Sequence, residues 1–107
     1  MVLSQIVSRA AFTPEKLGKV SLAQGDHLYA GLNCFLPGQE HKAHTHAGQD
    51  KIYLILEGSG EAMVNGEAAR VNAGDLVLAP AGAVHSLRNT GAVNLVVLVV
   101  LGPPPSK

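Results

Sequence analysis

Two stretches of the sequence decide the fold, and both place histidines between glycines. They read GQEHKAHTHAGQDKIYLILEG over residues 38–58 and GDLVLAPAGAVHSLRN over residues 74–89. In the first stretch one residue separates His44 from His46 within an expected strand, so both side chains point to the same face. Two imidazoles one strand step apart are well placed to share a metal ion. His41 lies one step out of phase, and we expect it to face away from the pair, toward solvent.

Short strands separated by turns are expected along most of the chain. Twelve glycines and six prolines leave little room for long helices. Asn65 and Gly66 form the strongest hairpin signal, because both residues tolerate the positive φ of a type I′ turn. The pattern predicts an all-β sandwich or barrel. The expected strands cover residues 19–23, 27–36, 41–47, 52–56, 60–64, 68–72, 75–79, 84–88 and 92–101.

The strands expected at 52–56 and 93–101 are apolar on both faces. Such strands must be covered on both sides. We therefore predict a homodimer in which one of these strands, or an N-terminal arm at residues 1–16, is shared between subunits. In the alternative, the N-terminal segment covers the outer face of its own chain. Three consecutive prolines predict that residues 103–107 form a flexible tail.

The composition argues against several classes of partner. The chain has 107 residues, which fits one domain, and eight Lys plus Arg balance eight Asp plus Glu. The sequence has no run of Lys or Arg that could bind phosphates or anionic lipid, so neither nucleic acid nor membrane is expected as a partner. Cys34 is a lone cysteine, and residues 1–11 lack the unbroken apolar region of a signal peptide. We expect a cytoplasmic protein that binds a small molecule.

The two quoted stretches resemble the signature motifs of the cupin superfamily. The second motif matches at every defined position, and its matching residues are Gly74, Pro80, Gly82, His85 and Asn89. The first motif, a glycine followed by His-x-His, an acid and a glycine, matches except at the acid. The resemblance covers about half the chain and implies a jelly-roll barrel, also called a double-stranded β-helix, over residues 17–102. We expect Asn89 to bond the backbone at the following turn.

The resemblance also implies a metal held by His44, His46 and His85. Three neutral imidazoles suit a divalent ion of iron, manganese, nickel, copper or zinc, and they leave its other positions open to water, substrate or oxygen. A site with this ligand set carries a charge of about +2, which favours an anionic ligand. An acidic fourth ligand lowers that charge to about +1.

The fourth ligand is the open question. Cupins that bind metal usually supply a Glu from the first motif, and here that position is Lys51, which cannot coordinate while protonated. Either the ion has three protein ligands, or Asp50, or less favourably Gln49, substitutes. Alternation places Asp50 and Lys51 on opposite faces of a strand. We expect Lys51 to extend to solvent and count Asp50 as the fourth candidate ligand.

Two functions follow from this site. The first is a metal-dependent enzyme acting on a small, anionic organic molecule. Cupins include oxygenases, isomerases, decarboxylases and lyases, so the fold alone does not choose a reaction. The second is a non-catalytic module that binds or senses a small ligand.

Overall fold

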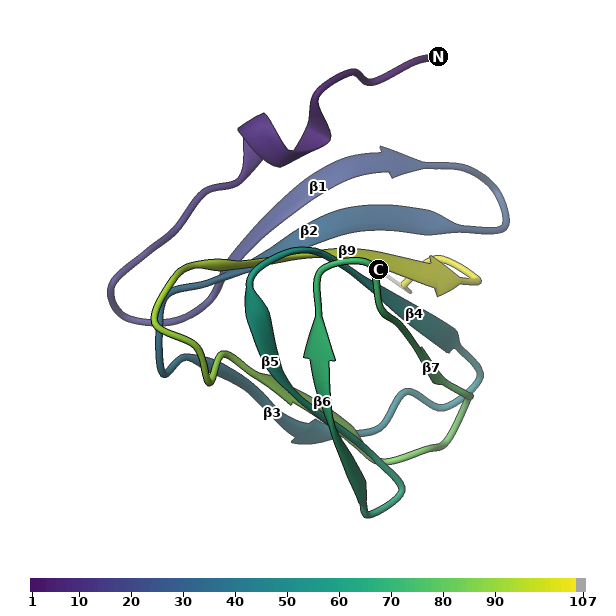
Figure 1. The fold of residues 1–107 in the computed structure, drawn as a ribbon. Helices are drawn as coiled ribbons and strands as arrows, with labels where there is room; N and C mark the ends of the chain where they lie inside the picture. The colour runs from purple at the N-terminus through teal and green to yellow at the C-terminus, as the bar shows by residue number, and fades with distance from the viewer. Residues whose placement is uncertain (106–107) are drawn as a thin grey trace.

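Nine β-strands in two antiparallel sheets make up the computed structural model, which describes residues 1–105 (Figure 1). The only other regular element in this range is one 3-10 helical turn, so the all-β prediction is confirmed. Each expected strand overlaps an observed one. The elements are η1 (Ile6–Arg9), β1 (Gly18–Gln24), β2 (Tyr29–Phe35), β3 (Glu40–His44), β4 (Asp50–Glu57), β5 (Ser59–Val64), β6 (Glu67–Asn72), β7 (Leu76–Ala79), β8 (His85–Arg88) and β9 (Leu95–Gly102).

The sheets bring together strands that are distant in the chain. One sheet has the order β1-β2-β9-β4-β7, and the other has the order β3-β8-β5-β6. The last strand, β9, therefore lies between β2 and β4, and β3 pairs with β8. Figure 1 shows the two sheets facing one another as the walls of a barrel. This is the jelly-roll arrangement that the motifs predict.

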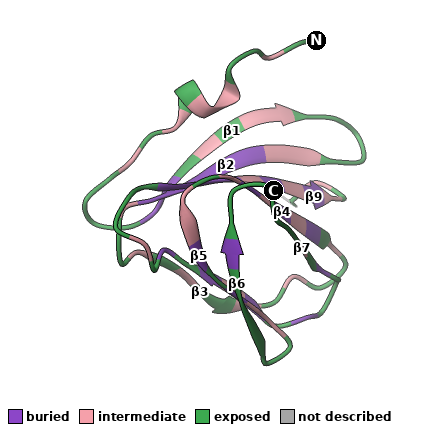
Figure 2. Ribbon diagram, in the orientation of Figure 1, coloured by how far each residue is buried: buried purple, intermediate pink, exposed green. Residues whose placement is uncertain are grey.

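The main core fills the space between the sheets. Figure 2 shows buried positions on β2 and β9, whereas the N-terminal turn is exposed or half-buried. Each fully buried large apolar side chain contributes about 1.5–3 kcal/mol, so this cluster stabilises the barrel. Its buried members are Leu17, Phe35, Tyr53, Ile55, Ala62, Val71, Leu87, Leu95, Val97, Val99 and Leu101.

A second cluster covers the outer face of the five-stranded sheet. Its buried residues are Leu32, Cys34 and Val96, and half-buried Ala10 and Phe12 of the N-terminal segment pack against them. In Figure 1 this segment runs along the outside of β1 and β2. The chain thus covers this face with its own N-terminal segment, as in the intramolecular alternative. The homodimer stays a prediction.

Glycines define two turns of the barrel. Asn65 and Gly66 link β5 to β6 with φ angles of 50° and 83°, which confirms the expected type I′ hairpin. Gly58, the closing glycine of the first motif, has a φ of 83°, and a Cβ there would collide with the backbone carbonyl of Asn94. Only glycine fits that position without moving the chain before β9.

The described part of the C-terminal segment contacts the barrel. The Gln49 amide donates a hydrogen bond to the carbonyl oxygen of Pro103 at 2.9 Å, and Pro105 lines a cavity. The end of the predicted tail, residues 106–107, lies outside the described residues. Within residues 1–105 no helix has the length and hydrophobicity that crossing a membrane requires.

Candidate metal centre and adjoining cavity

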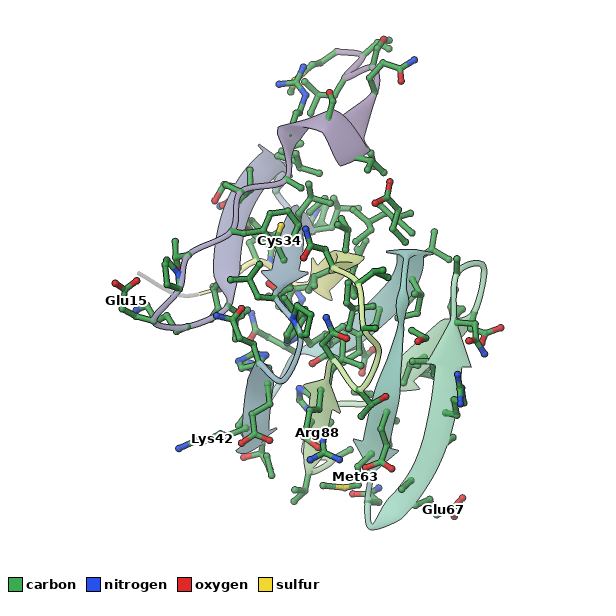
Figure 3. All side chains as sticks on the ribbon, turned by 60° about the vertical axis from the view of Figure 1, so that its left-hand side comes forward. Glu15, Cys34, Lys42, Met63, Glu67 and Arg88 are labelled. Carbon is green, nitrogen blue, oxygen red and sulfur yellow. The ribbon has the colours of Figure 1, made fainter. Side chains whose placement is uncertain are left out.

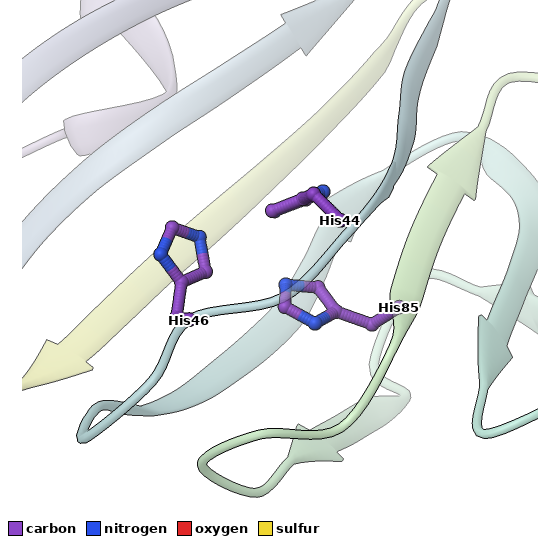
Figure 4. A group of neighbouring side chains, drawn as sticks. All are labelled: His44, His46 and His85. Atoms are coloured by element: carbon purple, nitrogen blue, oxygen red, sulfur yellow. The ribbon is translucent and has the colours of Figure 1, made fainter.

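The structure brings His44, His46 and His85 together. His44 ends β3 and pairs in register with His85 at the start of β8, and His46 lies in the loop that follows β3. The ring centroids of His44 and His85 are 4.1 Å apart, and that of His46 is 4.8 Å from the first and 5.4 Å from the second. One ring nitrogen of each residue lies within 4.8 Å of those of the other two. Figure 4 shows the three rings around a common space.

Backbone carbonyls orient two of these rings. Nδ1 of His44 lies 2.6 Å from the carbonyl oxygen of Lys42, and Nδ1 of His85 lies 3.0 Å from that of Ala83. A carbonyl only accepts hydrogen bonds, so each Nδ1 carries the proton and each Nε2 keeps a free lone pair. Both Nε2 atoms are buried and make no hydrogen bond within residues 1–105. Buried polar atoms normally have a partner, and a metal ion shared by these nitrogens supplies one.

The surroundings keep the three imidazoles neutral, which is the form that binds metal. The pKa of His44 is lowered to about 4, chiefly by burial; the Lys42 carbonyl opposes the shift, and the nearby His85 and Lys51 add to it. Burial is also the main cause that lowers the pKa of His46 and of His85. The donor set, its protonation and its unpartnered nitrogens therefore fit a divalent transition metal.

Asp50 is placed outside this group. It is exposed at the start of β4, and its carboxylate accepts a hydrogen bond of 2.9 Å from the backbone N–H of Ala81. That contact ties β4 to the turn of the second motif. The geometry thus favours the alternative in which the ion has three protein ligands.

The expectation that Lys51 extends to solvent is wrong. Its side chain is only 3% exposed, because β4 alternates so that Lys51, Tyr53 and Ile55 face the interior. The alternation argument itself holds, since of Asp50 and Lys51 only the lysine points inward. Its Nζ lies 4.7 Å from the centroid of the Tyr53 ring, within the range of a cation–π contact. Burial, and then the charge of Lys19, lowers the pKa of Lys51 to about 8.

The expectation that His41 faces solvent is also wrong. His41 pairs with Leu87 and His44 pairs with His85, so β3 has one more residue than β8 between these two pairs. This β-bulge breaks strict alternation and turns His41 toward the other histidines. Its ring centroid lies 4.1 Å from that of His44, and its buried Nδ1 has no hydrogen-bond partner among the described residues. Burial, and then the charge of Lys51, lowers the pKa of His41 to about 3.

A cavity of about 330 Å³ opens beside the histidines. This volume lies at the lower end of the range for small-molecule sites, about 300–1,000 Å³. Sequence reasoning missed Lys19 and Asn33 as wall residues. Both lie on the barrel side of paired strands, and only their cross-strand pairing shows that they meet. The polar lining is Lys19, Tyr29, Asn33, His41, His46 and Lys51, and the rest is Gly31, Val99, Leu101 and Pro105.

Comparison with known proteins agrees with this architecture. A protein of Thermotoga maritima named oxalate-binding protein is 38% identical, and the match covers 90% of this chain and 92% of that protein. A gentisate 1,2-dioxygenase of a Ralstonia species is 35% identical over 72% of this chain, but the match spans only 22% of that enzyme. The crystal structure of the protein TT1209 from Thermus thermophilus superposes with a TM-score of 0.93 at 38% identity, covering 98% of this chain and all of that one.

The family comparison matches most of the barrel. The family model described as a cupin domain aligns with residues 31–101, which include all three histidines of the centre and both glycine-bounded stretches. The resemblance read from the two motifs is therefore confirmed. By fold, motifs and family match, this chain belongs to the cupin family.

Proposed function

We propose that this protein is a metal-dependent enzyme that acts on a small, anionic organic molecule in the cavity beside its three histidines. The observation that carries the proposal is the pair of buried, unpartnered Nε2 atoms of His44 and His85. The cationic lining of the cavity supports the anionic class of substrate. The relatives agree in chemistry, since one is named for oxalate and another for gentisate, which are both small organic acids.

His44, His46 and His85 would hold the ion. A divalent transition metal with three histidine ligands supplies open coordination positions and Lewis acidity for a bound oxygen atom. The carbonyls of Lys42 and Ala83 hold two of the rings in place. The ring orientation is thus set by backbone and does not depend on a mobile side chain.

Lys51 would contact the substrate, and Tyr53, which does not line the cavity, lies close to Lys51 and His85. The charge of Lys51 attracts and orients an anion at the wall of the cavity. The hydroxyl of Tyr53 is buried without a partner among the described residues, and its ring centroid lies 6.1 Å from that of His85. Burial raises the pKa of Tyr53, so the hydroxyl keeps its proton and acts as a hydrogen-bond donor.

Elemental analysis of protein purified without added metal tests the centre. We expect a stoichiometric ion of iron, manganese, nickel, copper or zinc, which His44→Ala and His85→Ala both lose. His27→Ala is the matched control, since His27 is exposed in the loop before β2. Asp50→Asn should also keep the ion if three histidines suffice. Purified protein without a transition metal, whose metal content the histidine variants leave unchanged, would falsify the proposal.

A substrate panel then identifies the type of reaction. Oxygen uptake with small acids, diols and enols separates an oxygenase from an isomerase, decarboxylase or lyase, for which product analysis is the readout. His44→Ala should abolish whichever turnover is found. Turnover that persists after the metal is lost would contradict a metal-dependent reaction.

A non-catalytic binding module is the second candidate. It is favoured by the relative named oxalate-binding protein, whose length the match covers almost completely. Saturable binding of a small acid without turnover of that acid would select this function. The homodimer and the cytoplasmic location stay predictions under either function.

A further inference from the structure

Lys51 is a buried cation without a neutralising partner among the described residues. It is 3% exposed, and the charge that acts on its pKa after burial is that of another cation, Lys19. A buried ammonium group is costly unless an anion or a set of acceptors compensates it. The position is therefore unfavourable for folding alone, which points to a ligand as the missing partner.

Lys19 faces the same cavity from a different strand. Lys19 projects from β1, at one edge of the five-stranded sheet. Lys51 projects from β4, which β2 and β9 separate from β1. Lys19 lines this cavity together with His41 and His46, which places it beside the metal centre. Within residues 1–105, no Asp or Glu is among those that line the cavity. Two lysines of one sheet thus face a space without a carboxylate from this part of the chain.

The rest of the cavity lining is apolar, and the cavity as a whole is larger than a two-carbon diacid. Val99, Leu101 and Pro105 supply apolar walls, and the Tyr29 ring lies beside them. At about 30 Å³ per water molecule, the 330 Å³ space has room for roughly ten waters. A two-carbon diacid would leave most of this volume as water against apolar side chains. A ligand that fills the space needs an apolar body as well as a charge.

We propose that Lys51 and Lys19 form a carboxylate anchor that selects an organic acid with an apolar body the size of an aromatic ring. His46 belongs both to the lining and to the histidine group, so the body of an anchored acid extends from the lysines toward the metal centre. The anchor specifies the substrate class of the proposed function. Only the placement of the ligand's body toward the metal rests on that function.

Calorimetric titration with defined probes tests the anchor on the protein as purified, with its metal content measured. The probes are benzoate, its neutral isostere benzamide, and the small acids acetate and oxalate. We expect benzoate to bind more tightly than the other three by at least about tenfold. Lys51→Met and Lys19→Met should each weaken benzoate by about 10- to 100-fold, the range for a charge-assisted hydrogen bond, and leave benzamide unchanged.

Two further variants control the design. Arg70→Met removes an exposed positive charge from β6, in the other sheet, and should not change benzoate affinity. Lys19→Arg keeps the charge at an exposed position and should restore most of the affinity that Lys19→Met loses. Thermal melting of each variant checks that the barrel is folded, and Lys19 can be changed without disturbing the core.

The outcomes separate the anchor from the metal centre. Benzoate affinity that neither lysine variant changes would overturn the anchor, even if the metal is present and held by the histidines. If oxalate binds more tightly than benzoate, the inference that the ligand has an apolar body is wrong. Lysine-dependent binding of benzoate to protein that contains no metal would support the anchor while the proposed metal chemistry fails.

Discussion

The amide of Asn89 joins the backbone at the end of β2 to the loop before β9. It donates to the carbonyl oxygens of Phe35 at 3.0 Å and Val93 at 2.9 Å, and its oxygen accepts from the N–H of Gly91 at 2.9 Å. The residue is 1% exposed and its bond to Phe35 is buried, so the Phe35 carbonyl is left without a partner if the amide is lost. The structure confirms that this motif residue bonds the backbone at the turn.

Asn89→Ala should therefore lower the free energy of unfolding by about 2–4 kcal/mol, because it leaves the buried carbonyl of Phe35 unpaired and removes two part-buried hydrogen bonds. Urea denaturation measures the change. Thr90→Ala, at the exposed neighbouring position, should change stability by less than about 0.5 kcal/mol. An equal effect of the two substitutions would contradict the role assigned to the amide.

Lys51 makes stability depend on pH in a definite direction. Its pKa is lowered from 10.5 to about 8 in the folded chain, chiefly by burial. Between these values the unfolded chain binds more protons than the folded one, so the free energy of unfolding rises as pH rises from about 8 to 10.5. Below pH 8 the full cost of burying the charge is present, about 3 kcal/mol by linkage.

Lys51→Met should thus stabilise the protein at pH 7, by up to about 3 kcal/mol, and remove the rise in stability above pH 8. Denaturant unfolding at several pH values, with Lys42→Met as the exposed control, measures both effects. A variant that is more stable but binds its ligand less tightly is typical of a functional residue. If Lys51→Met is less stable than the parent at pH 7, the ammonium has a structural partner.

The β-bulge in β3 determines which histidines face the cavity. One additional residue between His41 and His44 lets both turn to the same side, and the chain leaves the sheet before His46. Bulges are common next to active sites because they redirect a side chain without disturbing the rest of the sheet. This element, and not the alternation of the sequence, sets the composition of the cavity wall.

The β5–β6 hairpin allows a test of backbone conformation alone. Gly66 has a φ of 83°, whereas Gly25 has no positive φ, and an added Cβ meets no atom within 4 Å at either position. Gly66→Ala should cost about 1–2 kcal/mol, because an L residue is strained in the left-handed region. Gly25→Ala should be neutral or slightly stabilising. Thermal melting of the two variants checks this, and similar melting temperatures would contradict it.

At the scale of the whole molecule, the β1-β2-β9 part of the five-stranded sheet is covered on both faces by the same chain. The barrel interior covers one face, and the N-terminal segment covers the other through Ala10 and Phe12. Cys34 lies fully buried in the outer cluster, and burial raises the pKa of its thiol. Figure 3 shows it beneath the N-terminal segment. The thiol should therefore react slowly with alkylating reagents.

Phe12→Ala should accelerate alkylation of Cys34 by iodoacetamide and lower stability by about 1–3 kcal/mol, since a half-buried aromatic is lost from the cover. Mass spectrometry follows the modification with time. Val2→Ala, at a position 87% exposed, is the control and should change neither quantity. An unchanged alkylation rate in Phe12→Ala would show that this side chain does not protect the cluster.

The homodimer is a prediction for the molecule as a whole. Edge strand β7 presents Leu76 and Leu78 at 60% and 53% exposure, so apolar surface remains after the N-terminal segment has packed. Light scattering during size-exclusion chromatography should give the mass of two chains. The mass of a single chain over a wide range of concentration would contradict the prediction.

The sequence by itself determined the fold class, the turns and three of the histidines. Gly74, Pro80 and Gly82 have a fixed spacing from His85, and His44 and His46 are near neighbours, so each motif is defined locally. The resemblance to the cupin motifs is what joined His85 to the other two histidines. The hairpin at Asn65 and Gly66 follows from the conformational freedom of two adjacent residues. Interactions between residues that are close in sequence can be predicted from the sequence, because the backbone conformation itself determines them.

Only the tertiary structure decided what surrounds the three histidines. Which of Asp50 and Lys51 points inward depends on how β4 packs against β9, and the position of His41 depends on a bulge formed against β8. Lys19 and Lys51 line one cavity only because their strands, β1 and β4, belong to the same sheet, with β2 and β9 between them. Such contacts are set by the pairing of distant strands. The energetic cost of burying the Lys51 charge likewise depends on residues that are far from it in the sequence.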